Sequence, residues 1–218
     1  MSLFYNVANT AMRTLLIALT KWKVEGRENV PRTGPLIVVA NHLTLIDPPL
    51  LGASVPRKIH FMAKEELFDS FRWRVIVEAY GAFPVRRGHW NRDALRRAAG
   101  ALDNGWALGL FPEGKRSADH RLQDPLPGAS LLAARTGAPI LPVGISGTER
   151  VNGLGFVLER PVITVRIGAP FALPSDGEKR TRVRLARYSD CIMEHIAELL
   201  PESYRGHYGP PSRAESDD

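Results

Sequence analysis

The amino-acid sequence predicts an α/β fold with a central mixed sheet flanked by helices and an amphipathic helix at the N-terminus. Short apolar runs rich in β-branched residues, such as residues 36–40, alternate along the chain with longer segments of helical periodicity. That is the order of elements in layered α/β proteins. The 218 residues and the hydrophobic content of 44% suffice for one full core. The apolar runs are far shorter than the ~20 residues that a membrane-spanning helix needs.

The first element is a helix expected at residues 3–22, where apolar side chains recur at helical spacing. Lys21 and Lys23 close this segment, and no pattern of a cleavable signal peptide precedes it. A helix with Phe, Leu and Trp on one face and basic residues at its end can lie in a membrane interface. The same stripe also suits a terminal helix packed on the core, so both readings stay open.

The strand expected at residues 36–40 ends in a polar stretch that contains His42 and Asp47. Pro48 favours a helix start directly after Asp47. His42 and Asp47 therefore belong at the carboxyl end of a strand, where open α/β sheets place their ligands. The pair suggests a histidine general base that is oriented by a carboxylate. Alternatively, Thr44 and Asp47 have the spacing of a capping box, with Asp47 serving only the helix.

The remaining elements alternate between strands and helices. A connector is expected at residues 24–34. Further strands are expected at residues 58–63, 81–85, 106–111, 139–145 and 162–167. Further helices are expected at residues 64–80, 91–104, 129–136 and 178–200. Gly137 follows the third of these helices at the position where a left-handed cap favours glycine.

Several cationic side chains follow the predicted strands. Lys64 stands at a junction between a strand and a helix, Arg86 follows a short strand, and Arg116 follows the strand at 106–111. Arginine can grip a phosphate with two hydrogen bonds, and lysine adds a point charge. Each cation alone is more typical of a solvated surface, so their significance depends on whether the fold brings them together.

Composition narrows the classes of partner and chemistry. The formal charge of +6 and the pI near 9.8 favour an anionic partner, which is a membrane surface, a phosphorylated substrate or nucleic acid. Nucleic acid is disfavoured because no aromatic platforms are interleaved with the basic residues. The single cysteine, Cys191, excludes an internal disulfide and is expected to be an inert core thiol. The sequence shows no metal-ligand spacing, so no metal site is expected.

Four segments together resemble the ordered sequence blocks of the glycerolipid acyltransferases, and most closely those of the bacterial 1-acyl-sn-glycerol-3-phosphate acyltransferases. These segments are residues 41–51, 81–88, 111–117 and 138–143. The resemblance covers about residues 24–170, with the blocks in the family's order and spacing. Each block is a weak signal alone, whereas four blocks in register make a specific one.

This resemblance implies transfer of an acyl chain from acyl-CoA or acyl carrier protein to the free hydroxyl of 1-acylglycerol 3-phosphate, which yields phosphatidic acid in phospholipid biosynthesis. His42 would be the general base and Asp47 its orienting partner. An acyl thioester is already activated, so no covalent nucleophile is needed. Consistent with this, the sequence lacks a Gly-x-Ser-x-Gly nucleophile elbow. No cofactor is implied besides the acyl donor.

The resemblance also implies the residues that bind the acceptor. Its phosphate would be held by Lys64, Arg86 and Arg116. Glu113 and Gly114 would shape the third block, with Glu113 anchoring its loop or touching the acceptor's hydroxyl. Two departures from the family's pattern leave the acceptor's identity open: Lys115 stands where a small residue is usual, and residues 124–128 lack a basic residue often found there.

These implications lead to an expected organisation in three parts. Residues 1–23 are expected to be a membrane-associating helix, residues 24–205 the acyltransferase domain, and residues 206–218 a disordered tail. The protein is expected to lie peripherally on the cytoplasmic face of the cell membrane and to contact its anionic surface. Alternatives are the same chemistry on glycerol 3-phosphate, on another lysophospholipid or on a glycolipid, and a lipid-surface binding protein without catalytic activity.

Overall fold

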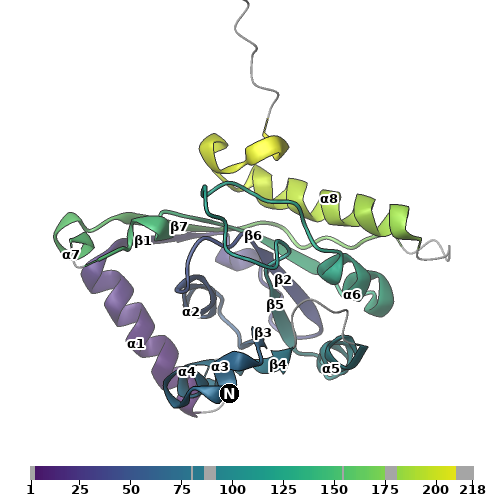
Figure 1. Ribbon diagram of the computed structural model, residues 1–218, viewed down its shortest axis with the longest axis horizontal. Coiled ribbons are helices and arrows are strands. Elements are labelled where there is room, and N and C mark those ends of the chain that lie inside the picture. Colours follow the sequence, from purple (N-terminus) through teal and green to yellow (C-terminus); the bar gives the residue numbers. More distant parts are fainter. Residues whose placement is uncertain (1–2, 80, 86–91, 154, 175–180, 210–218) are drawn as a thin grey trace, which may run out of the picture.

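The computed structural model describes residues 3–79, 81–85, 92–153, 155–174 and 181–209 (Figure 1). Within them the chain forms a seven-stranded sheet of order β1-β7-β6-β2-β5-β3-β4. Neighbouring strands are parallel except for β6 and β7, which are antiparallel, so the predicted mixed sheet is confirmed. The strands are Lys21–Glu25 (β1), Leu36–Ala40 (β2), Ile59–Lys64 (β3), Phe83–Val85 (β4), Ala107–Leu110 (β5), Ile140–Ser146 (β6) and Val162–Ile167 (β7).

Helices cover both faces of this sheet, as Figure 1 shows. One face packs against α1 and α2, and the other packs against α5, α6 and α8. The α-helices of the described residues are Leu3–Leu19 (α1), Asp47–Ser54 (α2), Glu66–Asp69 (α3), Phe71–Ala79 (α4), Arg92–Asp103 (α5), Gly128–Thr136 (α6), Phe156–Glu159 (α7) and Arg182–Glu198 (α8). The predicted layered fold with an N-terminal helix is therefore confirmed.

Strand β2 lies at the centre of the sheet and divides its side chains between the two cores. Leu36, Val38 and Ala40 pack in the core beneath α1 and α2. Ile37 and Val39 pack in the core beneath α5, α6 and α8. All five side chains are completely buried, which explains why the strand reads as an unbroken apolar run rather than an alternating one. The polar residues that follow β2 are thus held at the end of a fully buried central strand.

The N-terminal region differs from the sequence prediction. Helix α1 ends at Leu19, where the Thr20 hydroxyl donates a hydrogen bond of 2.6 Å to the Leu16 carbonyl. Lys21–Glu25 then forms the edge strand β1, in which Trp22 lies opposite Ile163 of β7. The predictions of helix up to residue 22 and of a connector from residue 24 are therefore wrong at these positions. The strand depends on a partner far away in the chain, which a local pattern does not reveal.

Two further predictions change in detail. The helix expected at residues 64–80 is divided into α3 and α4 at Ser70, whose backbone is extended. The prediction of a disordered tail is wrong for its first residues, because Gly206–Tyr208 forms a 3-10 helix (η4) that contacts α8. Residues 210–218 lie outside the described residues. Helix α8 begins at Arg182, capped by the Thr181 hydroxyl oxygen, which accepts the N–H of Arg184.

Candidate active site

Three neighbouring parallel strands, β5, β2 and β6, end at the same edge of the sheet. The segment after β2 carries His42, the segment after β5 carries Glu113, and the segment after β6 carries Thr148. All three side chains are buried. Because the carboxyl ends of parallel strands are where open α/β sheets bind ligands, this edge is the candidate active site.

The two residues that the sequence pairs as base and orienting partner lie in direct contact. Nδ1 of His42 is 2.8 Å from Oδ2 of Asp47. Asp47 is completely buried, whereas His42 keeps 8% of its surface exposed. A carboxylate at Nδ1 favours the tautomer with the proton on Nδ1, which leaves the lone pair of Nε2 available to accept a proton. The arrangement is that of a histidine base held by a carboxylate.

Asp47 also binds the backbone of the turn that precedes α2, although the N-cap of this helix is Ile46 and no side chain caps it, so the predicted capping box is not formed. Its Oδ2 atom accepts the backbone N–H groups of Leu43 and Thr44, each at 2.6 Å. Its Oδ1 atom accepts the hydroxyl of Thr44 at 3.1 Å and that of Thr148 at 2.8 Å. One carboxylate therefore fixes both the turn that leads into α2 and the imidazole of His42.

The backbone and ring of His42 are held by neighbouring segments. Its N–H donates to Oε1 of Glu113 at 2.8 Å, and its carbonyl accepts the N–H of Ser117 at 2.8 Å. The imidazole stacks on the ring of Phe111, with 4.2 Å between the ring centroids. The side chain of Asn41 bonds to both the N–H and the carbonyl of Ile145, at 2.7 and 2.8 Å, which ties β2 to β6. His42 therefore has little freedom to move.

Glu113 anchors the loop that follows β5. It is only 3% exposed, and its second carboxylate oxygen accepts the N–H of Gln123 at 3.1 Å. Burial raises the pKa of Glu113 to about 7, against the opposing effect of the N–H groups of His42 and Gln123. Gly114 follows in the left-handed conformation (φ 67°), where a side chain would be strained. Glu113 thus closes the loop at residues 113–123 through Gln123 and connects this loop to the backbone of His42.

The predicted phosphate-binding cations are not brought together by the described part of the structure. Arg116 is exposed in the loop after Glu113. Lys64 is the last residue of β3, but its side chain lies outside what the structure describes. Arg86 lies outside the described residues altogether. A common phosphate site therefore stays a prediction.

Sequence reasoning missed Thr148 and Gln123, which support Asp47 and Glu113 from other segments. The sequence signal available for Thr148 was the glycine before it, which is typical of a turn after a strand. In the structure Gly147 has a left-handed backbone (φ 89°) directly after β6, the neighbour of β2. Among the described residues, no group of three or more His, Cys, Asp or Glu side chains is placed to hold a metal ion.

Comparisons with known proteins extend the match beyond the site. The model of a family described as Acyltransferase matches residues 21–146. A protein of Bacillus subtilis named 1-acyl-sn-glycerol-3-phosphate acyltransferase is 26% identical over 197 residues, which are 89% of this chain and 96% of the relative. A Streptococcus pneumoniae protein of the same name is 27% identical over 201 residues, which are 88% and 73% of the two chains. The crystal structure of a 1-acyl-sn-glycerophosphate acyltransferase from Thermotoga maritima has a TM-score of 0.69 and 27% identity, covering 89% of this chain and 79% of that one.

Proposed function

This chain belongs to the acyltransferase family, and we propose that it acylates the free hydroxyl of 1-acylglycerol 3-phosphate with an acyl chain from acyl-CoA or acyl carrier protein. The product is phosphatidic acid, which places the enzyme in phospholipid biosynthesis. The observation that carries the proposal is the buried pair of His42 and Asp47 within the segment that matches the family. The names of the relatives from Bacillus subtilis and Streptococcus pneumoniae support the acceptor.

In the proposed mechanism, Nε2 of His42 removes the proton from the acceptor's hydroxyl as that oxygen attacks the carbonyl carbon of the thioester. Asp47 holds the Nδ1 proton and stabilises the imidazolium that forms. The new ester bond forms, the carbon–sulfur bond breaks, and the imidazolium returns its proton to the departing thiolate. General-base help of this kind contributes ~10²–10⁴-fold to the rate.

We assign the acceptor's phosphate to Lys64, Arg86 and Arg116. Support for Arg116 comes from its neighbour Ser117, whose N–H donates a hydrogen bond to the carbonyl of His42. Arg116 therefore lies in the loop that is bonded to the backbone of the proposed base. Both carboxylate oxygens of Glu113 accept backbone N–H groups. This favours the loop-anchoring role of Glu113 over a contact with the acceptor's hydroxyl.

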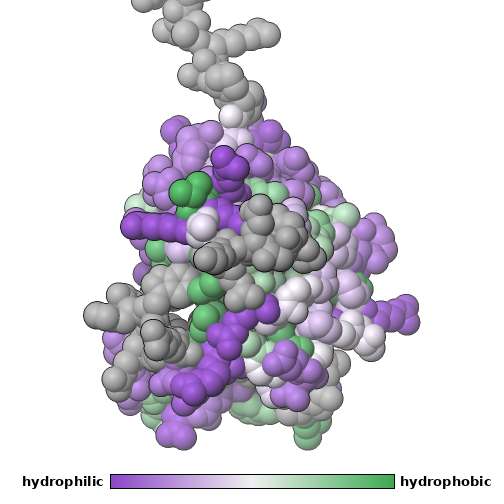
Figure 2. Space-filling model, turned by 90° about the vertical axis from the view of Figure 1, so that its right-hand side faces the viewer, coloured by the Kyte–Doolittle hydropathy of each residue, from purple (hydrophilic) through white to green (hydrophobic). Residues whose placement is uncertain are grey.

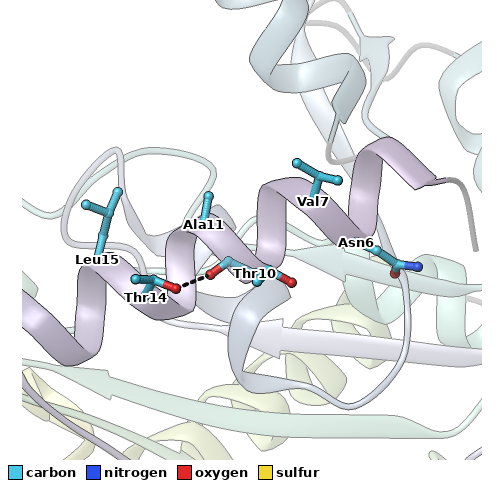
Figure 3. Close-up of a pocket in the computed structure, with 6 residues that line it drawn as sticks. All are labelled: Asn6, Val7, Thr10, Ala11, Thr14 and Leu15. Atoms are coloured by element: carbon cyan, nitrogen blue, oxygen red, sulfur yellow. Dashed lines mark hydrogen bonds between the residues drawn. The ribbon is translucent and has the colours of Figure 1, made fainter.

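A lysophospholipid acceptor resides in a membrane, and the outer face of α1 suits contact with one. Figure 3 shows a shallow pocket along this helix, where Val7, Ala11 and Leu15 project from one side beside Thr10 and Thr14. The large apolar side chains that α1 exposes are Leu3, Phe4, Val7, Leu15 and Ile17. Helices α4 and α7, which contact α1, add Phe71 and Leu158 with 82% and 91% of their surface exposed. Such a group of neighbouring exposed apolar side chains on a protein surface is typical of an interaction site.

We therefore propose that the outer face of α1 rests in the surface of an anionic bilayer, with the exposed Lys21 and Lys23 near the lipid headgroups. None of the described helices meets the length and hydropathy required to cross a membrane. The first turns of α8 carry Arg182, Arg184 and Arg187. This helix lies on the opposite face of the sheet, so a flat bilayer under α1 does not reach these arginines (Figure 1). The side of the molecule formed by α5, α6 and the start of α8 is mostly hydrophilic (Figure 2).

The cytoplasmic face of the membrane is proposed because the chain has one cysteine and therefore no internal disulfide, which suits a reducing compartment.

An acyl-transfer assay of the purified protein tests the function. Lysophosphatidate, glycerol 3-phosphate and a lysophospholipid without a free phosphate are offered side by side, with acyl-CoA and acyl carrier protein as donors. We expect phosphatidic acid from lysophosphatidate at the highest kcat/KM. A preference for another acceptor would overturn the acceptor, and vesicle binding without turnover on any acceptor would favour a lipid-surface binding protein.

A further inference from the structure

We propose that Thr148 is a positioning residue for the pair of His42 and Asp47, a role that rests on the proposed function. Thr148 is completely buried, and its Oγ1 donates a hydrogen bond of 2.8 Å to Oδ1 of Asp47. It lies in η2 (Thr148–Arg150), just beyond the segment that matches the family and outside the four sequence blocks. Since Thr148 has no exposed surface, it acts on the reaction through Asp47 rather than by touching a substrate.

The two oxygens of the Asp47 carboxylate have different tasks. Oδ2 faces the imidazole of His42 and the turn between the two residues. Oδ1 accepts two hydroxyl groups, one of which belongs to Thr44 within the same turn. Among the hydrogen bonds that Asp47 accepts from the described residues, that of Thr148 is the one that comes from far along the chain, 101 residues away. Thr148 thereby fixes the rotation of the carboxylate relative to the sheet rather than only to its own turn.

The segment that carries Thr148 is itself held in place. Gly147 has φ 89°, and a Cβ there would lie 2.1 Å from the Val162 carbonyl oxygen, so the turn after β6 closes against β7 only with glycine. On the other side, the carboxylate of Glu149 accepts the hydroxyl of Tyr204 at 2.6 Å. The backbone carbonyl of Tyr204 also accepts a hydrogen bond from the N–H of Leu122. Thr148 therefore lies in a segment that is held on both sides, by the turn at Gly147 and by the hydrogen bond of Glu149, and can fix the orientation of Asp47.

Replacing Thr148 by valine removes the hydroxyl at nearly constant volume. Among the donors in the described residues, the Oδ1 atom then keeps only the Thr44 hydroxyl, which moves with Asp47 itself. A carboxylate that rotates more freely holds the Nδ1 proton of His42 less well, and this loss is felt when the imidazolium forms. Because a hydrogen bond to a charged group is involved, we expect kcat to fall roughly 10- to 100-fold. The KM values for donor and acceptor should stay near those of the wild type.

The test compares Thr148→Val and Thr148→Ser with the wild type in kcat, in both KM values and in the unfolding midpoint. Thr148→Ser keeps the hydroxyl and should restore most of kcat. The matched control is Thr20→Val, which removes another buried hydroxyl, bonded to the Leu16 carbonyl rather than to Asp47, and should leave kcat unchanged. Wild-type kcat in folded Thr148→Val, or a loss carried by KM, would overturn the proposal. If Thr148→Val does not fold, Thr148→Cys replaces it with a weaker donor, and wild-type kcat there would equally overturn the proposal.

A second measurement separates this proposal from the proposed function. In protein labelled with ¹⁵N-histidine, the Nδ1 proton of His42 should give a low-field NMR signal in the wild type and in Thr148→Ser. The signal should broaden or vanish in Thr148→Val, because the proton is less well held. An unchanged signal in Thr148→Val would overturn the positioning role even if the enzyme is fully active. Absence of acyl transfer in the wild type would instead overturn the proposed function and leave this readout valid.

Discussion

Replacing Glu113 by glutamine should change how the stability of the protein depends on pH. Burial raises the pKa of Glu113 from 4.5 to about 7, so the folded state binds this proton more tightly than the unfolded state does. The stabilisation linked to that proton is complete below about pH 4.5. It is lost as the pH rises through about 7, where the buried carboxyl group ionises.

The size of this effect follows from the two pKa values. Between 4.5 and about 7, each pH unit changes the linked free energy of unfolding by about 1.36 kcal/mol, so the full change is about 3 kcal/mol. Glutamine does not titrate, so the change is absent from Glu113→Gln. Its amide NH₂ faces the N–H of His42 or Gln123, which costs about 1–3 kcal/mol at every pH. The variant should therefore be the less stable protein in acid and should gain on the wild type as the pH rises.

Urea unfolding of both proteins at a series of pH values between about 4 and 8 measures the two free energies. Their difference cancels the titrations that the two proteins share. We expect the stability of Glu113→Gln relative to the wild type to rise by about 3 kcal/mol across this interval. A difference that stays constant with pH would refute the raised pKa of Glu113, whereas a difference with the opposite slope would mean that its hydrogen bonds outweigh its burial.

Three further predictions concern catalysis, acceptor binding and membrane binding. Asp47→Asn should lower kcat by ~10²–10⁴-fold in steady-state assays, because the amide does not hold the imidazole in the required tautomer; unchanged turnover would exclude an orienting role. Arg116→Gln should raise the acceptor KM roughly 10- to 100-fold and spare the donor KM, while the neighbouring Lys115→Gln has a smaller effect; an equal effect of both changes would argue against a specific contact. Val7→Asn should weaken co-sedimentation with anionic vesicles about tenfold, whereas Val183→Asn, at an exposed valine of α8 on the other face, should not; equal binding would place the membrane contact elsewhere.

The sequence predicts the fold best where an element depends on its own residues. The strand at residues 162–167 has the predicted bounds, since its alternation of apolar and polar side chains is local. The strand β1 was missed because Lys21–Glu25 is a strand only through pairing with β7, over 130 residues away. The divided helix at Ser70 was missed because nothing in its local periodicity marks a break.

The site follows the same division between local and distant contacts. His42 and Asp47 are five residues apart, so one turn brings them together and their pairing could be inferred from spacing. Thr148 and Gln123 reach the site from other segments, which only the folded chain reveals. The sequence left two roles open for Glu113, and its geometry favours the anchoring one because both oxygens bind backbone N–H groups.

The claim that His42 is the general base is tested most directly by the kcat of His42→Ala with lysophosphatidate and acyl-CoA. His42→Gln, which preserves most of the side chain's volume, is measured beside it as a control for packing. The predicted result is a fall of ~10²–10⁴-fold in both variants, with far-UV circular dichroism and the unfolding midpoint like those of the wild type. Turnover within a few-fold of the wild type in a folded His42→Ala protein would contradict the assignment.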